Sequence, residues 1–564
     1  MRNCAAVHSR PFDIAQILKD AVTLHQQGRL REAEKLYTRV LKAAPDNFDA
    51  LHLLGLVKAQ NGQTGEAYRM MAAALKINPN VPDVLINFAN VLHALKRDGE
   101  ALNCLNKALA LRPGDPDALL YRGNALNVLN RPNEALPCFD AVLARNPAHR
   151  DARLNRGTAL ATLGRPAQAL ADFDAVLARA PNDAEALYNR GTALIELGRH
   201  ADALLALDRA LIGAPKHLKA WTNRGRALQA LNRHDEAVTS FEKAMALDKD
   251  SADAHFNAAL SLLTLGQFRR GFEEYEWRWK RTGMTDARRG HRGRLWLGEF
   301  PLDRRTILLS AEQGLGDTIQ FVRYVPLLVR AGARVVLEVQ PELKTLLSGV
   351  SGVASCHARG EALPDCDLYC PLGSLPLALK TEPSTVPTDI PYLHADDAHI
   401  AKWRPSVEAL PGKRVALAWA GHSRHANDRN RSIELELLQP LFACEGVSFV
   451  SIQRDLRGDD AARLAEHGIT DCGPRLSDMA DTAAITALAD LTISVDTSVV
   501  HLAGAMGREA WVLLPFSPDW RWTLTNERSP WYPKLRLFRQ RASGDWPDVI
   551  TAACDALRRV SATD

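Results

Sequence analysis

The sequence has few features that would tie it to a membrane, to nucleic acid or to an oxidising compartment. No stretch approaches about eighteen uninterrupted apolar residues and residues 1–10 have no apolar centre, so we expect neither a membrane span nor a signal peptide. The 70 basic and 66 acidic residues leave a formal net charge of +4, which favours no nucleic-acid or membrane partner. The nine cysteines form no Cys-x-x-Cys pair, so neither a disulfide framework nor a zinc site is expected. These absences predict a cytoplasmic protein.

A repeat with a period of 34 residues fills the first half of the chain. Proline keeps this period at Pro45, Pro79, Pro113, Pro147, Pro181 and Pro215, and alanine keeps it at Ala33, Ala67, Ala101, Ala135, Ala169, Ala203 and Ala237. A column of Gly or Ala begins at Gly55, and a second column, mostly Gly, begins at Gly28. Small residues let two helices approach closely, the second glycine column is expected at the turn between them, and the proline closes the unit. The period and these positions resemble the tetratricopeptide repeat.

About seven full repeats run from Ile14 to Ser251, and a degenerate eighth covers residues 252–281. The eighth is rich in aromatic residues, namely Phe268, Phe272, Tyr275, Trp277 and Trp279. We therefore expect it to dock onto the region that follows.

One helix position of the repeats carries Asn87, Asn155, Asn189, Asn223 and Asn257. This column resembles the asparagine ladder with which the repeats of protein O-GlcNAc transferase hold peptide backbone, since amides both donate and accept hydrogen bonds. The alternative is a solvated inner face or bonding between repeats. A neighbouring arginine column, with acids at another fixed position, is more consistent with ion pairs between repeats.

The pattern changes to α/β after the repeats. Residues 281–305 are basic and contain glycine, which is typical of a linker. Strands are expected at residues 306–310, 335–339, 367–370, 414–419, 447–453, 491–495 and 510–514, with a weaker one near Val353. After the first of these strands we expect a Gly-rich loop at residues 311–317 and a helix at residues 318–331. A Pro-rich passage at 383–391 separates two series. The sequence thus predicts two Rossmann-like halves that bind a ligand between their carboxyl edges.

The stretch around Asp496, Thr497 and Ser498 follows a buried strand and opens a helix. Backbone N–H groups of Ser498 and Val499, with the helix dipole, would suit a diphosphate at that edge. The alternative is a simple helix N-cap, with His501 as an ordinary helix residue.

Four segments together resemble a GT-B glycosyltransferase domain like the heptosyltransferases of glycosyltransferase family nine, over residues 300–560. These are Gln313–Asp317, Trp419–Gly421, Asp496–His501 and Pro515–Trp522. The resemblance implies a nucleotide-sugar donor held mainly by the second half, through Trp419, Asp496, Thr497, Ser498 and His501. It also implies that Asp317 is the general base, with Gln313, Gly314 and Gly316 forming a loop near the acceptor.

The chain departs from that family after Gly421. Where the heptosyltransferases carry a Ser or Thr and later a Lys, this chain offers Arg424, Arg429 and Arg431 as cations for the diphosphate. A solvated loop is the alternative. No Asp-x-Asp pair is placed as a metal clamp, so neither a metal nor a cofactor is expected, the nucleotide-sugar being a substrate. Residues Trp520–Trp522 either stack on the base of the nucleotide or cap the core. Asp317 is either the general base or a helix cap, and if it is a cap, the base is to be sought among Glu312, His422 and His425.

The predicted architecture is an α-solenoid of tetratricopeptide repeats followed by an α/β GT-B domain. Its parts are a repeat superhelix at 14–281, a linker at 282–303, an acceptor-side half at 304–390 and a donor-side half at 391–564. The expected function is metal-independent, inverting transfer of a sugar to a protein or glycan hydroxyl, with the repeats recruiting the acceptor. The alternative is a repeat scaffold for protein–protein interaction that carries a degenerate transferase-like domain.

Overall fold

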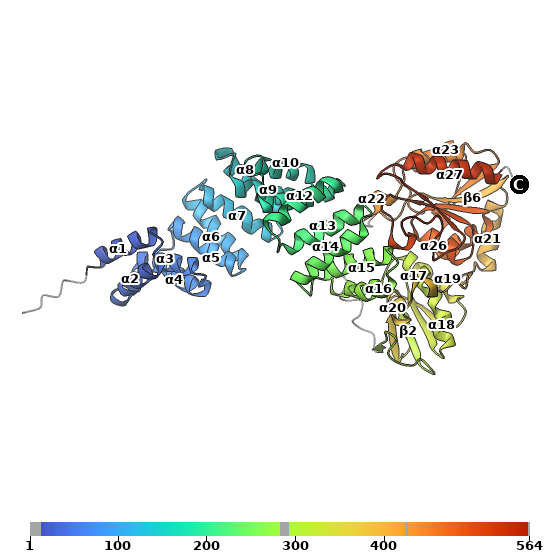
Figure 1. Ribbon diagram of the computed structural model, residues 1–564, viewed down its shortest axis with the longest axis horizontal. Coiled ribbons are helices and arrows are strands. Elements are labelled where there is room, and N and C mark those ends of the chain that lie inside the picture. Colours follow the sequence, from blue (N-terminus) through green and yellow to red (C-terminus); the bar gives the residue numbers. More distant parts are fainter. Residues whose placement is uncertain (1–12, 282–292, 424–426, 562–564) are drawn as a thin grey trace, which may run out of the picture. The chain divides into compact units, whose positions relative to one another are not determined.

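A computed structural model describes residues 13–281, 293–423 and 427–561. The chain forms two compact units that divide after Pro215. Figure 1 shows helices alone in the first unit and a mixture of helices and strands in the second. Arg424, His425 and the predicted linker residues 282–292 lie outside the described residues.

The first unit consists of antiparallel helix pairs, as the 34-residue period predicts. They are α1 (Ile14–Gln26), α2 (Leu30–Ala43), α3 (Phe48–Gln60), α4 (Thr64–Ile77), α5 (Pro82–Ala94), α6 (Asp98–Leu111), α7 (Pro116–Val128), α8 (Pro132–Arg145), α9 (Arg150–Thr162), α10 (Pro166–Leu177), α11 (Ala184–Glu196) and α12 (His200–Gly213). The alanine column is buried throughout this unit.

The glycine columns explain how each pair closes. A Cβ added to Gly157 would lie 2.5 Å from Cε1 of Phe173, so only glycine lets α9 and α10 approach this closely. The column at the turn has positive φ at all eight positions, including φ 60° at Lys96 and φ 56° at Asn130. Left-handed backbone favours Gly or Asn, which is why the column contains them.

The second unit opens with two further repeats. Their helices are α13 (Leu218–Ala230), α14 (His234–Leu247), α15 (Ala252–Thr264) and α16 (Phe268–Tyr275), followed by a 3-10 turn, η1 (Glu276–Lys280). The aromatic residues Phe268, Phe272 and Tyr275 are buried, as expected for a docking repeat.

The first α/β half is a five-stranded parallel sheet. Its order is β1 (Arg294–Leu295), β5 (Leu368–Pro371), β2 (Thr306–Ser310), β3 (Arg334–Val339) and β4 (Val353–Ala358). The connecting elements include α17 (Leu315–Phe321), η2 (Val322–Tyr324), α18 (Val325–Arg330), η3 (Pro341–Leu343), α19 (Lys344–Ser348), η4 (Leu372–Ser374), α20 (Leu375–Ala378) and η5 (Pro383–Thr385).

Two details of this half differ from the sequence prediction. Arg294 and Leu295 pair with β5, and the nearby Trp296 is 3% exposed, so the second part of the predicted linker belongs to the sheet. Helix α17 begins at Leu315, three residues before the expected start at Thr318, because Gly314 acts as its N-cap.

The second α/β half is a six-stranded parallel sheet. Its order is β11 (Leu535–Arg539), β10 (Ala510–Leu514), β9 (Leu491–Val495), β6 (Lys413–Ala418), β7 (Val447–Ser451) and β8 (Thr470–Asp471). Its main helices are α21 (Asp397–Val407), α22 (Asp428–Arg431), α23 (Gln439–Phe442), α24 (Asp460–Glu466), α25 (Met479–Leu488), α26 (Ser498–Ala505) and α27 (Trp546–Ser561), with 3-10 turns η6 (Leu435–Leu438), η7 (Gly473–Arg475) and η8 (Trp520–Trp522).

Helices cover both faces of this second sheet. Val415 and Leu417 of β6 pack in the core beneath α23 and α27, whereas Ala416 and Ala418 face the core beneath α21 and α25. Figure 1 shows α23 and α27 on one side of β6, with α21 and α26 on the other. A continuous apolar run buried on both faces is what a parallel sheet requires.

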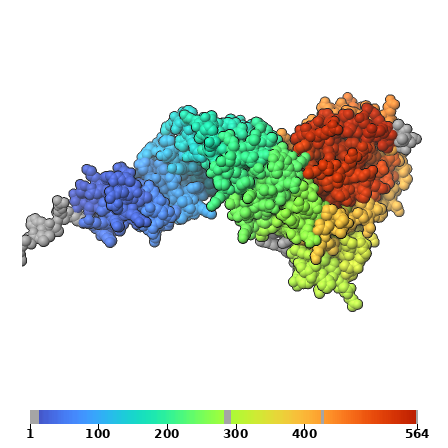
Figure 2. Space-filling view, viewed as in Figure 1, coloured from blue at the N-terminus to red at the C-terminus, as the bar shows by residue number. Residues whose placement is uncertain are grey.

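One hydrophobic core joins the last repeat to both α/β halves. It includes Phe268 and Phe272 of α16, Ile319 of α17, and Leu502 and Ala503 of α26. In Figure 2 the green surface of the last repeats runs directly into the yellow surface of the first half. The α/β halves and the last repeat are therefore packed as one structural body.

Candidate functional site

The predicted phosphate turn forms at the carboxyl end of β9. Asp496 follows the strand, Thr497 is the N-cap of α26, and the helix begins at Ser498. The Thr497 hydroxyl accepts a hydrogen bond from the Val499 N–H at 3.3 Å and lies 3.1 Å from the Ser494 hydroxyl. The alternative of an N-cap is thus correct for Thr497, and one of the two N–H groups expected to face an anion already has a partner.

Arg431 lies at this turn. Its Nη1 donates to the Asp496 carbonyl oxygen at 2.9 Å, and a Cβ on Gly421 would lie 2.5 Å from its Nη2. Gly421 therefore gives the guanidinium room to lie against the backbone. Arg429 belongs to the same short helix, α22, but its side chain is exposed. Of the two described arginines predicted here, the structure brings only Arg431 to the turn.

Charged groups surround the Asp496 carboxyl, which is buried although the residue as a whole is partly exposed. Burial of the carboxyl, together with the nearby carboxylate of Asp519, raises the pKa of Asp496 to about 7, and Arg431 and Arg521 partly offset that rise. A carboxyl with this pKa exchanges its proton near neutral pH. The turn therefore combines two acidic groups with two arginines.

His501 lies one turn into α26 and is buried, at 5% exposure. Its Nδ1 is 3.0 Å from the Tyr532 hydroxyl, and its ring packs over Gly316 of α17, where an added Cβ would be 2.8 Å from Cδ2. Burial and the positive charges of Arg521, Arg323 and Arg431 hold the pKa of His501 well below its usual range. His501 is thus a neutral contact between the two α/β halves, and its imidazole is turned toward α17.

Asp317, the predicted base, reaches the same place from the first half. It is the third residue of α17, and its Oδ2 accepts a hydrogen bond from the Gly314 N–H at 2.9 Å. Its Oδ1 forms an ion pair with Nη2 of Arg521. Asp317 is therefore a helix cap that also carries an interaction between the halves, with its side chain 23% exposed.

Arg521 is the residue that sequence reasoning missed. Its side chain is 8% exposed and contacts Asp519 at 2.8 Å, the Gln320 side chain and Asp317. Burial opposes its charge, but the carboxylates of Asp519 and Asp317 keep the pKa of Arg521 above its usual range. The sequence did contain a signal for Arg521, because a cation lies close to Asp519 after the carboxyl end of β10. The two flanking tryptophans drew attention to stacking instead.

The aromatic residues considered for stacking on a base are buried. Trp520 is 4% exposed and Trp522 0%, so the alternative of a core cap describes both. Trp419 is 1% exposed, and its Nε1 donates to Asp460 at 3.2 Å. Its indole therefore packs in the core of the second half, which removes the side chain predicted to bind the donor from the site.

Two of the other candidate bases, Glu312 and His422, lie among the described residues. Glu312 is 3% exposed and pairs with Arg278 at 3.1 Å, while His422 is exposed in the segment after β6. Gln313, predicted near an acceptor, donates instead to the Tyr275 hydroxyl at 3.0 Å. Within the described ranges, no group of three or more His, Cys, Asp or Glu side chains is placed to hold a metal ion.

Comparison with known proteins identifies the repeats. Residues 128–171 and 155–217 match a tetratricopeptide repeat model, and residues 225–266 match a second TPR repeat model. Residues 26–108 match a model described as anaphase-promoting complex, cyclosome, subunit 3. The helical half is built of tetratricopeptide repeats.

A curated relative extends the comparison. The chain is 28% identical over 341 residues to protein FlbA of Caulobacter vibrioides, and the match covers 56% of this chain and 56% of FlbA. The chain thus spans about half the length of the relative it matches.

Solved structures are also similar to part of the chain. A tetratricopeptide repeat protein from Parabacteroides merdae is 21% identical, with a TM-score of 0.37, and covers 44% of this chain and 98% of its own. MamA from Desulfovibrio magneticus is 27% identical, with a TM-score of 0.28, and covers 30% and 96%.

The asparagine column of the tetratricopeptide repeats is partly used in bonds between repeats. Asn87 lies 3.1 Å from His52 Nε2, and Asn155 donates to Asn124 at 2.8 Å. Asn223 is 8% exposed, and Asn257 donates to a carbonyl of its own helix. Asn189 is partly exposed. The alternative of inter-repeat bonding therefore describes Asn87 and Asn155.

The arginine column forms the predicted ion pairs in two repeats. Arg156 pairs with Asp140 at 2.7 Å, and Arg190 pairs with Asp174 at 2.7 Å. Each pair joins the first helix of one tetratricopeptide repeat to the second helix of the preceding repeat.

Among the described residues, no helix combines the length and the apolar character that a membrane span requires.

Proposed function

We propose that the α/β region is a metal-independent, inverting glycosyltransferase that moves a sugar from a nucleotide-sugar to a protein or glycan hydroxyl. One observation carries the proposal: Asp317, after β2 of the first half, meets Arg521, after β10 of the second half. Both follow the carboxyl ends of parallel strands, the edge at which α/β sheets bind ligands. Two parallel sheets whose binding edges share a charge pair suit a substrate that spans both halves.

The donor side of the proposal rests on the turn before α26. Arg431 and Arg521 supply two cations near the helix N-terminus, and the Ser498 hydroxyl adds a donor there. Guanidinium groups bind phosphate oxygens in pairs and stay charged on burial. We propose that these groups hold the diphosphate and offset the charge that develops as it leaves.

The acceptor side rests on Asp317. In the proposed step, an Asp317 oxygen takes the proton of the acceptor hydroxyl, the hydroxyl oxygen bonds to the sugar C1, and the C1–O bond to the diphosphate breaks. The bonding electrons leave with the nucleoside diphosphate, whose charge Arg521 and Arg431 offset. Arg521 would thus exchange its Asp317 partner for phosphate, which frees the carboxylate when donor binds. General-base help of this kind contributes about a hundredfold to ten-thousandfold.

The tetratricopeptide repeats would recruit the acceptor, since such repeats form extended surfaces for protein binding. The eight cysteines among the described residues are free, and we propose a cytoplasmic location.

A second candidate function is a non-catalytic scaffold. The observation that favours it is the state of Asp317, which already caps α17 and pairs with Arg521. In this alternative the charge pair only fastens the two halves together, and the repeats carry the function by binding proteins.

Binding of nucleoside diphosphates and nucleotide-sugars in EDTA tests the proposal. A ligand at 100 times its Kd should stabilise the protein by about 2.7 kcal/mol, which a thermal-shift screen detects. Ser498→Trp should abolish the shift, because the indole fills the space before α26, whereas Ser348→Trp on the exposed end of α19 should not. No shift with any nucleotide would favour the scaffold, and a shift that requires divalent metal would refute metal independence.

A further inference from the structure

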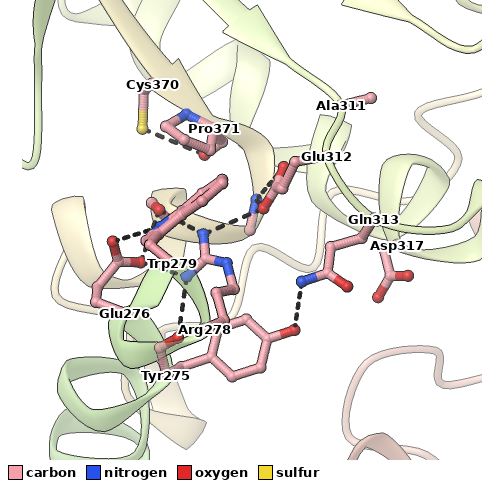
Figure 3. Close-up of polar contacts among 12 residues, drawn as sticks. Tyr275, Glu276, Arg278, Trp279, Ala311, Glu312, Gln313, Asp317, Cys370 and Pro371 are labelled. Atoms are coloured by element: carbon pink, nitrogen blue, oxygen red, sulfur yellow. Dashed lines mark hydrogen bonds and ion pairs between the residues drawn. The ribbon is translucent and has the colours of Figure 1, made fainter. Parts of the chain in front are cut away.

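The eighth tetratricopeptide repeat sends an arginine into the first α/β half. Arg278 of η1 is 1% exposed. Its Nη2 donates to Glu312 Oε1 at 3.1 Å and to the Ser374 hydroxyl at 2.7 Å, and its Nη1 donates to Glu276 at 2.5 Å. Figure 3 shows its guanidinium between the two glutamates. Glu312 belongs to the loop between β2 and α17, so the repeat is bonded directly to the loop that leads into the first turn of α17, where the proposed base lies.

Tyr275 makes a second contact with the same loop. Its hydroxyl accepts a hydrogen bond from Gln313 Nε2 at 3.0 Å (Figure 3). The Gln313 carbonyl in turn accepts from Gln340 Nε2 at 2.8 Å, and Gln340 Oε1 accepts from the Thr318 hydroxyl at 3.0 Å. This chain of bonds runs from the repeat, around the loop, to the residue next to Asp317.

The loop is fixed from the sheet side as well. The Gly373 N–H donates to Glu312 Oε1 at 3.1 Å, and a Cβ on Gly373 would lie 2.5 Å from that oxygen. Glu312 is therefore held between a backbone N–H of the first half and a guanidinium of the repeat. A buried carboxylate that lost its cation would be left without compensation, which is costly.

The repeats also contact the second half. Phe272 and Trp520 meet edge to face at 5.9 Å between ring centroids, and Asn232, in the turn between α13 and α14 of the seventh repeat, donates to the Phe516 carbonyl at 2.6 Å. Trp520 is the neighbour of Arg521. The last two repeats thus reach the segments that carry both members of the Asp317–Arg521 pair.

We propose that the last tetratricopeptide repeat is part of the functional site, in which Tyr275 and Arg278 are positioning residues for the segment Ala311–Asp317, which comprises the loop after β2 and the first turn of α17. The catalytic meaning of this inference rests on the proposed function, since it assigns Asp317 as the base. The structural part of the inference, that the repeat orders this segment, does not depend on the proposed function. The last repeat and the base would then be set in one fixed geometry within the second unit.

Two variants of the full chain test the inference. Tyr275→Phe removes one hydroxyl and keeps the ring, so the fold should persist while Gln313 loses its partner. Arg269→Ala is the matched control, because it removes an exposed ion pair between the same helix and Glu382 without touching the loop. Hydrogen exchange measured by mass spectrometry should be about fivefold faster at residues 312–317 in Tyr275→Phe and unchanged in Arg269→Ala. Unchanged exchange in Tyr275→Phe would overturn the inference, whether or not the protein is a transferase.

Kinetics separate positioning from general packing. In Tyr275→Phe we expect kcat to fall about fivefold or more while the KM for the donor stays constant, because the donor is held by the second half. A rise in donor KM with constant kcat would contradict a role in positioning Asp317. If the wild-type protein binds no nucleotide and transfers no sugar, the proposed function is wrong. The hydrogen-exchange measurement alone then decides whether the repeat orders this segment.

Discussion

At the scale of single residues, the candidate site is a set of charges contributed by separate segments. Asp317 comes from α17, Asp496 from the turn after β9, and Asp519 and Arg521 from the segment after β10. Buried cations and carboxylates are stable together only while each has partners. The arrangement therefore makes both stability and ligand affinity sensitive to pH and to single substitutions.

Asp496 provides a prediction about pH. Its pKa is raised to about 7 in the folded protein, mainly by burial and then by Asp519. The folded state thus binds this proton more tightly than the unfolded chain does, and its stabilising effect is complete below the unfolded pKa of about 4 and is lost as pH rises through 7. Asp496→Asn should therefore raise Tm at pH 8 by on the order of 2 °C.

The difference should shrink toward pH 4, where Asp496 is protonated in the wild-type protein. Thermal unfolding of both proteins across this range measures it, with Asp519 left intact. If the Tm difference, Asp496→Asn minus wild type, is instead lower at pH 8 than at pH 5, the folded protein stabilises Asp496 as a carboxylate and the prediction is wrong.

At the scale of elements, α17 and α26 are the contact between the two halves. Gly316 lets the helices meet, since an added Cβ would be 2.8 Å from the His501 ring, and Tyr532 holds that ring in place. Gly316→Ala should destabilise the protein by about 1–3 kcal/mol, because the helices must move apart. The same change should weaken nucleotide binding, since α26 would shift.

Gly99→Ala is the matched control for this prediction. Gly99 lies in α6 with no heavy atom within 4 Å of an added Cβ, so alanine there should stabilise by about 0.5 kcal/mol. Chemical denaturation of both variants compares them. If both variants change the free energy of unfolding equally and with the same sign, the close approach of Gly316 to the His501 ring does not exclude a Cβ as proposed.

The sequence was sufficient for most of the elements, although it missed β1, β8 and β11, and it was only partly sufficient for the site. Periodicity predicted the repeat helices and the buried strands, since both are set by local patterns such as the apolar run 491–495. The start of α17 at Leu315 was missed because a glycine N-cap resembles a loop. Arg521 was missed because its role depends on an ion pair with Asp317, which lies more than two hundred residues earlier in the chain. Trp419 was assigned to the donor because burial of a side chain beside a binding edge leaves no mark in the local sequence.

At the scale of the whole molecule, the last two repeats belong to the same compact unit as the α/β region, and the earlier repeats form another unit. If the earlier repeats bind a protein acceptor, the amide of Asn189 is the suitable probe, because Asn155 bonds to Asn124 and Asn223 is buried.

Asn189→Ala should therefore raise the KM for a protein acceptor about fivefold, the effect of one lost hydrogen bond, and leave nucleotide affinity unchanged. Gln168→Ala, at an exposed position on α10, should change neither value. Steady-state transfer assays with both variants make the comparison. Equal KM values for Asn189→Ala and wild type would assign the asparagine column to the repeat fold alone.

The central claim is that Asp317 acts on a nucleotide-sugar held by the second half, and donor turnover in Asp317→Asn tests it most directly. Asparagine can still accept the Gly314 N–H bond, so the cap is kept while the base is lost. With the nucleotide-sugar that the binding screen selects, calorimetry should give a Kd within about twofold of wild type, and acceptor-dependent donor consumption should fall about a hundredfold or more. Normal consumption by a variant that binds donor normally would contradict the account and leave Asp317 as a helix cap.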